Sequence, residues 1–273
     1  MKKIQFIVSF IIITLFISCE EVIEVDLDTA PPRLVVDASI DWFKDTDGSE
    51  QTIKLSTTTG YYSNVIPAVT GATVFVTNSE GTVFDFSEVQ GTGEYVCTNF
   101  IPVIGETYTL TVTYNNQTYT AVETLYAVPE ISSVEQNNEG GFLGNNIEVR
   151  FFYQDNPLED NFYMTRFDVG FLPFPDYNVS EDRLFQGNQM FGIFSDEDLE
   201  PGNILDIKLY GISQRYYSYM QLLITISRGS GAGPFQSVPA TVRGNLINQT
   251  DSENYALGYF RLSEVSALQY TVQ

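Results

Sequence analysis

Histidine is absent from the 273-residue chain. Without an imidazole the chain cannot supply a Ser-His-Asp or Cys-His catalytic centre, a histidine general base or a His-ligated zinc site. Because so much acid–base, nucleophilic and metal-assisted chemistry depends on this side chain, its absence disfavours an enzyme before any motif is considered. We therefore expect no catalytic residues, no metal site and no cofactor.

Positive charge is also scarce, since 13 Lys and Arg stand against 35 Asp and Glu and leave a formal net charge of −22. An acidic surface repels phosphate backbones, which excludes nucleic acid as a partner. Charged residues of both signs make up 18% of the chain, below the ~25% of typical globular domains, and 43% of residues are apolar. The chain can therefore form a core, and its length fits one large or two ordinary domains.

Only two cysteines occur, and the first of them ends an N-terminal apolar segment. Lys2 and Lys3 precede an apolar run over residues 4–17, which Ser18 and Cys19 close. The run is shorter than the ~20 residues that a membrane-spanning helix needs. We interpret residues 1–18 as a secretory signal peptide, with an uncleaved N-terminal membrane anchor as the alternative.

The residues Phe16-Ile17-Ser18-Cys19 resemble a bacterial lipobox, in which Phe16 replaces the usual Leu. Cleavage before Cys19 would leave an N-terminal cysteine that carries acyl chains, and each buried CH₂ contributes roughly 0.8 kcal/mol of membrane affinity. Cys97 then has no partner and is expected to be a small buried apolar residue. A Cys19–Cys97 disulfide in a secreted protein without lipid is the alternative.

Residues 19–32 are expected to form an acidic tether. Glu20 and Glu21 follow Cys19 directly, and Asp28 is the last of five acidic residues within nine positions. These residues form at least a solvated spacer. Glu20 and Glu21 also resemble the signal that sends lipoproteins of Bacteroidota to the cell surface. We therefore expect a lipid-anchored protein of the outer membrane, displayed at the cell surface.

Residues 33–128 have a β pattern throughout. The clearest strand covers residues 107–114, where Tyr and aliphatic side chains alternate with threonines, and Asn115-Asn116 follows as a tight turn. About seven short strands at this spacing predict an immunoglobulin-like β-sandwich.

Pro129 and the Asn- and Gly-rich residues 137–141 indicate a domain boundary. Residues 129–273 are expected to form a second β-rich domain. Within it, residues 213–227 have apolar side chains three and four positions apart, and Ser213 is placed as an N-cap. The fold class is therefore mainly β with one helix.

The order of several short motifs resembles the DUF4249 lipoproteins of Bacteroidota across nearly the whole mature chain. The matching motifs lie at residues 18–27, 32–36, 71–74, 107–112, 242–246 and 256–260. The family has no established activity, and its members resemble accessory lipoproteins encoded beside TonB-dependent receptors. The resemblance implies a non-enzymatic surface partner of such a transporter that helps to capture a ligand. An adhesin-like or structural β-sandwich lipoprotein without a transporter partner is the alternative.

Aromatic residues are concentrated between residues 162 and 194, where nine of 33 residues are Phe or Tyr, about twice the frequency in the whole chain. Phe171, Phe174 and Tyr177 lie in a Pro-rich, loop-like context. Aromatic side chains on loops can anchor a partner or ligand because each buries a large area with few rotatable bonds. We expect these three to contact a partner or ligand, and the alternative is that they belong to the core of the second domain.

Two acidic groups suggest further chemistry, each with a simpler explanation. Residues 45–50 alternate oxygen ligands around Gly48 and resemble a fragment of a calcium loop, or else form a solvated hairpin loop. Asp155, Glu159 and Asp160 are the candidates for a hydrolase that uses only carboxylates, although acidic residues this frequent also cluster by chance.

Overall fold

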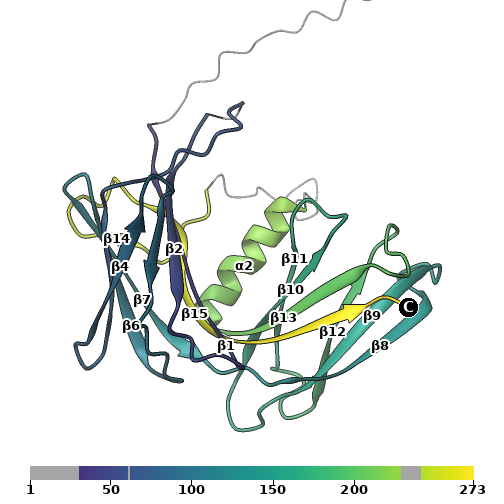
Figure 1. The fold of residues 1–273 in the computed structure, drawn as a ribbon. Coiled ribbons are helices and arrows are strands. Elements are labelled where there is room, and N and C mark those ends of the chain that lie inside the picture. The colour runs from purple at the N-terminus through teal and green to yellow at the C-terminus, as the bar shows by residue number, and fades with distance from the viewer. Residues whose placement is uncertain (1–30, 61, 229–240) are drawn as a thin grey trace, which may run out of the picture. The chain divides into compact units, whose positions relative to one another are not determined.

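The computed structural model describes residues 31–60, 62–228 and 241–273, and residues 32–273 form one compact unit. These residues form fifteen strands and, within the described ranges, a single helix (Figure 1). The prediction of a mainly β fold with one helix is therefore confirmed. None of the helical structure in the described part is long and apolar enough to cross a membrane. The predicted signal peptide, Cys19, Glu20, Glu21 and nearly all of the tether lie outside the described residues.

Eight strands form a closed, barrel-like part of the larger sheet. Seven come from the first half of the chain and follow the order β1-β2-β5-β4-β3-β6-β7. The eighth, the C-terminal strand, pairs in parallel with both β1 and β7 and so closes the ring. Their bounds are β1 (Leu34–Phe43), β2 (Gln51–Thr57), β3 (Thr73–Asn78), β4 (Val83–Val89), β5 (Glu94–Cys97), β6 (Thr107–Tyr114), β7 (Gln117–Tyr126) and β15 (Leu257–Thr271).

The alternating side chains of these strands fill a first hydrophobic core. In β6, Tyr108, Leu110 and Val112 are buried, while the threonines between them face outward, as the period of two predicts. The turn after β6 has Asn115 and Asn116 at φ values of 49° and 57°, a left-handed conformation that Asn tolerates. Cys97 is buried in the same core and has a free thiol.

The remaining strands build two layers around a second core. Three of them continue the larger sheet beyond β15, and three form a separate sheet in the order β12-β9-β8. Side chains from both sheets meet in this core, including Phe151 of β9 and Phe167 of β10, whose ring centroids are 5.9 Å apart. The bounds are β8 (Ile131–Gly140), β9 (Asn146–Gln154), β10 (Phe162–Val169), β11 (Asp176–Glu181), β12 (Gln189–Ser195), β13 (Ile204–Ile212) and the short β14 (Ile247–Asn248) beside β7.

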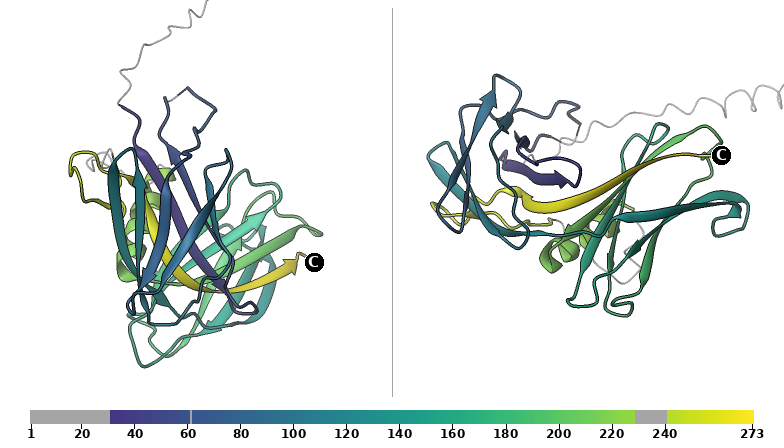
Figure 2. Two further views of the ribbon diagram at one scale, coloured as in Figure 1. Left: turned by 60° about the vertical axis from the view of Figure 1, so that its left-hand side comes forward. Right: turned by 60° about the horizontal axis from the view of Figure 1, so that its bottom comes forward.

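Strand β15 belongs to both parts of the fold, and Figure 2 shows it as one continuous yellow strand. Its first half pairs with β1 and places Phe260 and Leu262 in the first core. Its second half pairs with β13, and Val272, just beyond its end, lies in the second core. Each core therefore contains residues from distant parts of the sequence. The division into domains at 33–128 and 129–273 stays a prediction.

Helix α2 (Gln214–Ser227) covers the face of β10 and β13 that points away from the three-stranded sheet. Ser213 is its N-cap, as predicted, and its hydroxyl accepts a hydrogen bond of 3.1 Å from the backbone N–H of Tyr216. Tyr216 and Met220 on its buried side pack against Tyr210, Met164 and neighbouring side chains in a third hydrophobic cluster.

Candidate functional site

The three aromatic residues predicted as contacts do not form one site. Phe171 packs against the second core and Tyr177 against the third cluster, so each is partly buried in a different place. Phe174 is 79% exposed, at the edge of a shallow groove of about 500 Å³. Arg228 also lines this groove, where its guanidinium donates to the Asp176 carboxylate at 2.7 Å. Of the three, Phe174 alone has the exposure that a contact residue needs.

The candidate carboxylates are also separated. Asp155 is buried and accepts hydrogen bonds from the Tyr163 hydroxyl at 2.5 Å and from the Gly187 N–H at 2.7 Å. Glu159 and Asp160 are exposed on the loop that follows. Asp155 therefore fixes the loop between β9 and β10, and its two oxygens are already engaged by donors from the protein.

The loop between the antiparallel strands β1 and β2 is held by its own short-range hydrogen bonds. Asp47 Oδ1 accepts from the Ser49 N–H at 3.0 Å and from its hydroxyl at 2.8 Å, and these bonds lower the pKa of Asp47. Gly48 has a φ of 68°, which favours glycine. Within the described ranges, no three Asp, Glu or Cys side chains are arranged to hold a metal ion.

A groove of about 350 Å³ lies where the end of β7 meets the start of β10. Tyr126 and Phe162 give it aromatic walls, Val128 adds an aliphatic one, and Glu159 and Asp160 supply carboxylates. Burial raises the pKa of Tyr126, and the negative charges of Glu123 and Glu159 raise it further, so its hydroxyl remains a hydrogen-bond donor. The groove therefore suits a ligand that combines an apolar body with cationic or hydrogen-donating groups.

A buried carboxylate joins the closed sheet to the helix near this groove. Glu123 of β7 accepts hydrogen bonds on Oε2 from the Ser213 hydroxyl at 3.0 Å and from the Tyr259 hydroxyl at 3.2 Å. Burial raises the pKa of Glu123, and hydrogen bonds from Thr124, Ser213 and Tyr259 offset part of that rise. Ser213 thus caps the helix and also donates to β7, which fixes the start of α2 against the closed sheet.

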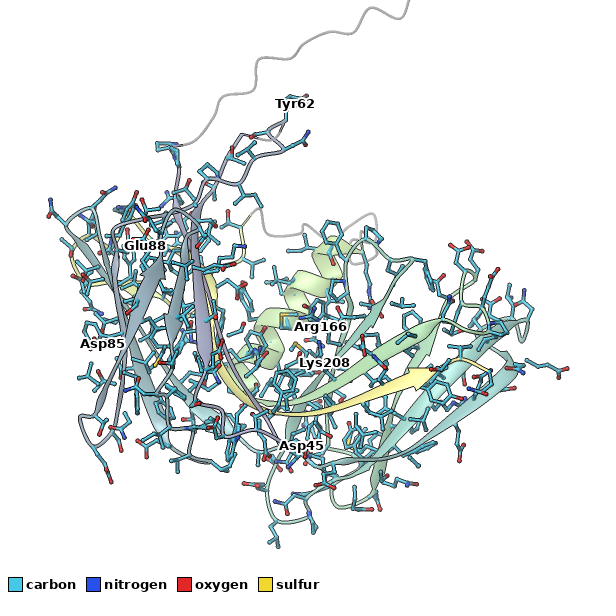
Figure 3. All side chains as sticks on the ribbon, viewed as in Figure 1. Asp45, Tyr62, Asp85, Glu88, Arg166 and Lys208 are labelled. Atoms are coloured by element: carbon cyan, nitrogen blue, oxygen red, sulfur yellow. The ribbon has the colours of Figure 1, made fainter. Side chains whose placement is uncertain are left out.

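A buried arginine on β15 is a second feature that sequence patterns did not indicate. Arg261 is 4% exposed, and its guanidinium is 2.7 Å from the Asp41 carboxylate and 4.9 Å from the centre of the Tyr210 ring. Arg166 and Lys208 share Asp168 on the same sheet face, at 2.8 Å and 3.3 Å (Figure 3). The Arg261–Asp41 and Lys208–Asp168 pairs each join two different strands, 220 and 40 residues apart in the sequence, so no local motif marks them.

Similarity to solved structures is weak. A two-domain fibronectin type-III segment from chicken tenascin matches 66% of this chain and 90% of its own length, with 11% identity and a TM-score of 0.21. A DUF4785 family protein from Legionella pneumophila matches 65% of this chain and 52% of its own length, with 7% identity and a TM-score of 0.27. TM-scores this low do not establish a shared fold.

No curated protein matches the sequence. A family model does match, and it extends over residues 20–269, from the residue after Cys19 almost to the end of β15. This range includes the first hydrophobic core, all buried residues of the second core except Val272, and the groove between β7 and β10. The chain therefore belongs to the family described as a domain of unknown function, DUF4249.

Proposed function

We propose that the chain is an outer-membrane lipoprotein of Bacteroidota, displayed at the cell surface, that serves as a non-enzymatic accessory or ligand-capture partner of a TonB-dependent transporter. The observation that carries the proposal is the cysteine at residue 19. It follows an apolar segment too short to span a membrane and precedes an acid-rich tether that leads into a β fold. Membership of the DUF4249 family supports the same assignment.

The groove between β7 and β10 supports the ligand-capture part of the proposal. Its volume of about 350 Å³ lies in the range of small-molecule sites, roughly 300–1,000 Å³. Ile104 contributes to its wall, and Leu158, on the loop that carries Glu159 and Asp160, is 88% exposed. An apolar rim beside a carboxylate-bearing groove allows a second protein to cover a bound ligand.

We also propose that strands β1 to β7 are a variant of the immunoglobulin-like sandwich. In that fold one sheet has the strand order A-B-E-D and the other contains C, F and G. The order β1-β2-β5-β4 followed by β3-β6-β7 corresponds to it strand by strand. Here the β3–β4 hairpin joins the two sheets on one side, and β15 closes the other.

The experiment that tests the transporter partnership is crosslinking of native outer membranes, mild solubilisation and capture with an antibody against the folded domain. Mass spectrometry should identify a TonB-dependent β-barrel receptor that is enriched over a strain with Cys19→Ser. Labelled palmitate should enter the wild-type chain and not the Cys19→Ser chain. Recovery of the lipoprotein without any barrel protein would contradict the partnership, and absence of label would contradict the anchor.

An exposed aromatic face favours an adhesin-like role as the second candidate. On the outer face of the three-stranded sheet, the rings of Phe152 and Phe191 are 6.1 Å apart, and the Arg150 guanidinium is 5.7 Å from the Phe191 ring. Phe191 is 53% exposed, so a flat partner such as a sugar ring can reach it. This role predicts that a deletion strain loses attachment, whereas the transporter role predicts a growth defect on particular nutrients.

A further inference from the structure

Acidic residues are distributed unevenly along this strongly acidic chain. Two long segments, residues 51–79 and 207–250, contain no Asp or Glu, although the chain has 35 acidic residues among 273. All the charged side chains in these segments are positive: Lys54, Lys208, Arg215, Arg228 and Arg243. Three of these cations pair with acidic residues outside the two segments, Lys54 with Glu94, Lys208 with Asp168 and Arg228 with Asp176. Among the described residues, Arg215 and Arg243 form no such ion pair.

The two segments meet at Arg33, the residue that begins the fold after the tether. The Arg33 and Arg243 guanidinium carbons lie 3.8 Å and 3.6 Å from the centre of the Tyr255 ring, so the ring lies between the two cations. The backbone of Arg33 is bonded to Thr58, where the loop between β2 and β3 begins. The Arg33 N–H donates to the Thr58 hydroxyl and the Thr58 N–H donates to the Arg33 carbonyl, both at 2.9 Å. The Thr57 N–H bonds to the Pro67 carbonyl at 3.0 Å and closes the base of this loop.

The described residues 58–60 and 62–67, here called the 58–67 loop, expose large apolar side chains. Tyr62, Val65 and Ile66 are each more than 70% exposed, and Figure 3 shows Tyr62 at the tip of the loop, beyond the ends of the strands. Ser63 shapes the tip, since its hydroxyl bonds to both the N–H and the carbonyl of Val65. Exposed aliphatic and tyrosine side chains beside an arginine are typical of surfaces that lie in a membrane interface. The loop itself contains no Asp or Glu, and the acidic Glu253 lies beside Arg33, whose guanidinium donates to the Glu253 carbonyl at 3.2 Å.

A groove of about 280 Å³ adds a third cation, Arg215, beside Arg243. It lies between α2 and residues 241–244, and both Arg215 and Arg243 line it. Tyr219 and Leu222 supply apolar walls. Two guanidinium groups and an apolar wall fit an anionic headgroup and the first part of its acyl chain.

We propose that the 58–67 loop, with Arg33, Arg215 and Arg243, docks directly on an anionic lipid bilayer. The inference rests on the proposed lipid anchor, because Arg33 is 14 residues from Cys19 and an extended tether of that length reaches about 50 Å. The anchor holds this end of the fold near the membrane, and the negative charge elsewhere on the chain is repelled from anionic headgroups. The domain therefore has one preferred orientation on the bilayer.

The test uses the full mature chain with Cys19→Ser, so that no acyl group contributes to binding. Flotation is measured with vesicles of phosphatidylcholine alone and with 30% phosphatidylglycerol. We expect binding to the anionic vesicles that weakens at least tenfold in Val65→Asp/Ile66→Asp, and Arg243→Gln should reduce the preference for phosphatidylglycerol. The matched control is Phe142→Asp/Leu143→Asp, which changes two apolar residues between β8 and β9 that are even more exposed than Val65 and Ile66, and it should leave flotation unchanged.

Absence of flotation, or equal flotation of the loop variant and the control variant, would overturn the docking proposal. Loss of transporter capture in lipidated Val65→Asp/Ile66→Asp, without vesicle binding by the parent, would assign the loop to a protein partner instead. Palmitate labelling of Cys19 tests the lipid anchor independently of the flotation assay. Label with no flotation refutes the docking surface alone, whereas flotation without label refutes the anchor on which the proposed function depends.

Discussion

Asp41→Asn is expected to destabilise the protein more than Arg261→Met, although the two substitutions remove the same ion pair. The Arg261 side chain is 5% exposed and the Asp41 side chain 26%. Asp41→Asn leaves a buried guanidinium without its counter-charge, which costs about 3 kcal/mol, the low end of the range for breaking buried pairs. Arg261→Met leaves a carboxylate that water can reach, and it removes two guanidinium nitrogens, Nε and Nη1, that have no hydrogen-bond partner among the described residues. Its cost is about 1–2 kcal/mol, mainly the lost contact with the Tyr210 ring.

Urea unfolding followed by tryptophan fluorescence measures both effects. Trp42, the single tryptophan of the chain, is adjacent to Asp41, and its indole N–H donates to the Thr46 carbonyl at 2.9 Å. The double variant should be about as stable as Arg261→Met alone, so the coupling energy equals the cost of Asp41→Asn, about 3 kcal/mol. The m-values should remain equal, since the unfolded surface is unchanged. A cost for Arg261→Met that exceeds the cost for Asp41→Asn would refute this reasoning.

Substitutions at Ser213, Glu123 and Gly258 test other contacts. Ser213→Ala should lower the free energy of unfolding by about 1–2 kcal/mol because it removes both the helix cap and a donor to Glu123. Ser213→Thr should retain most of that stability. Thermal unfolding measures both variants, and an unchanged Tm in Ser213→Ala would contradict the cap. Because burial raises the pKa of Glu123 above 4.5, the folded state holds this proton more tightly, and stability falls as pH rises from the unfolded pKa through the folded one. The stability of Glu123→Gln relative to wild type should therefore increase with pH across that interval in urea titrations, whereas a constant difference would exclude the shift. Gly258 has a φ of 91°, and a Cβ there would lie 2.0 Å from the Val36 carbonyl oxygen. Gly81 has a similar φ but open space around it, so Gly81→Ala should cost roughly 1 kcal/mol of stability and Gly258→Ala several times as much. Equal urea midpoints for the two glycine variants would show that the contact relaxes freely.

Local patterns predicted the elements well because each depends on neighbouring residues. The alternation in β6 follows from one buried face, and the cap at Ser213 requires only the three residues after it. The closure of the sheet was not predictable in the same way. The pairing of Val35 with Leu257 joins residues more than two hundred positions apart, and a single sequence contains no signal for such a contact.

The candidate site was harder to predict from the sequence, also because its residues come from distant parts of the chain. Phe171 and Tyr177 were grouped by proximity in the chain, yet they pack into different hydrophobic clusters because the intervening turn directs them to different layers. Tyr126 and Phe162 face one groove although a β-sheet hairpin separates them in the chain. Proximity along the chain therefore identified exposed Phe174 and missed the groove.

Because β15 pairs with β1, the first strand of the fold is fully hydrogen-bonded only after residues 257–265 are present. Strand β1 has β2 on one edge and β15 on the other, so a polypeptide that ends before Leu257 lacks the partner along nine positions of its first strand. Loop-closure entropy for so long a separation must be overcome before that pairing contributes. During synthesis from the N-terminus, this edge of β1 therefore stays unpaired until residues 257–265 have been made, and products that terminate before Leu257 remain open to proteolysis.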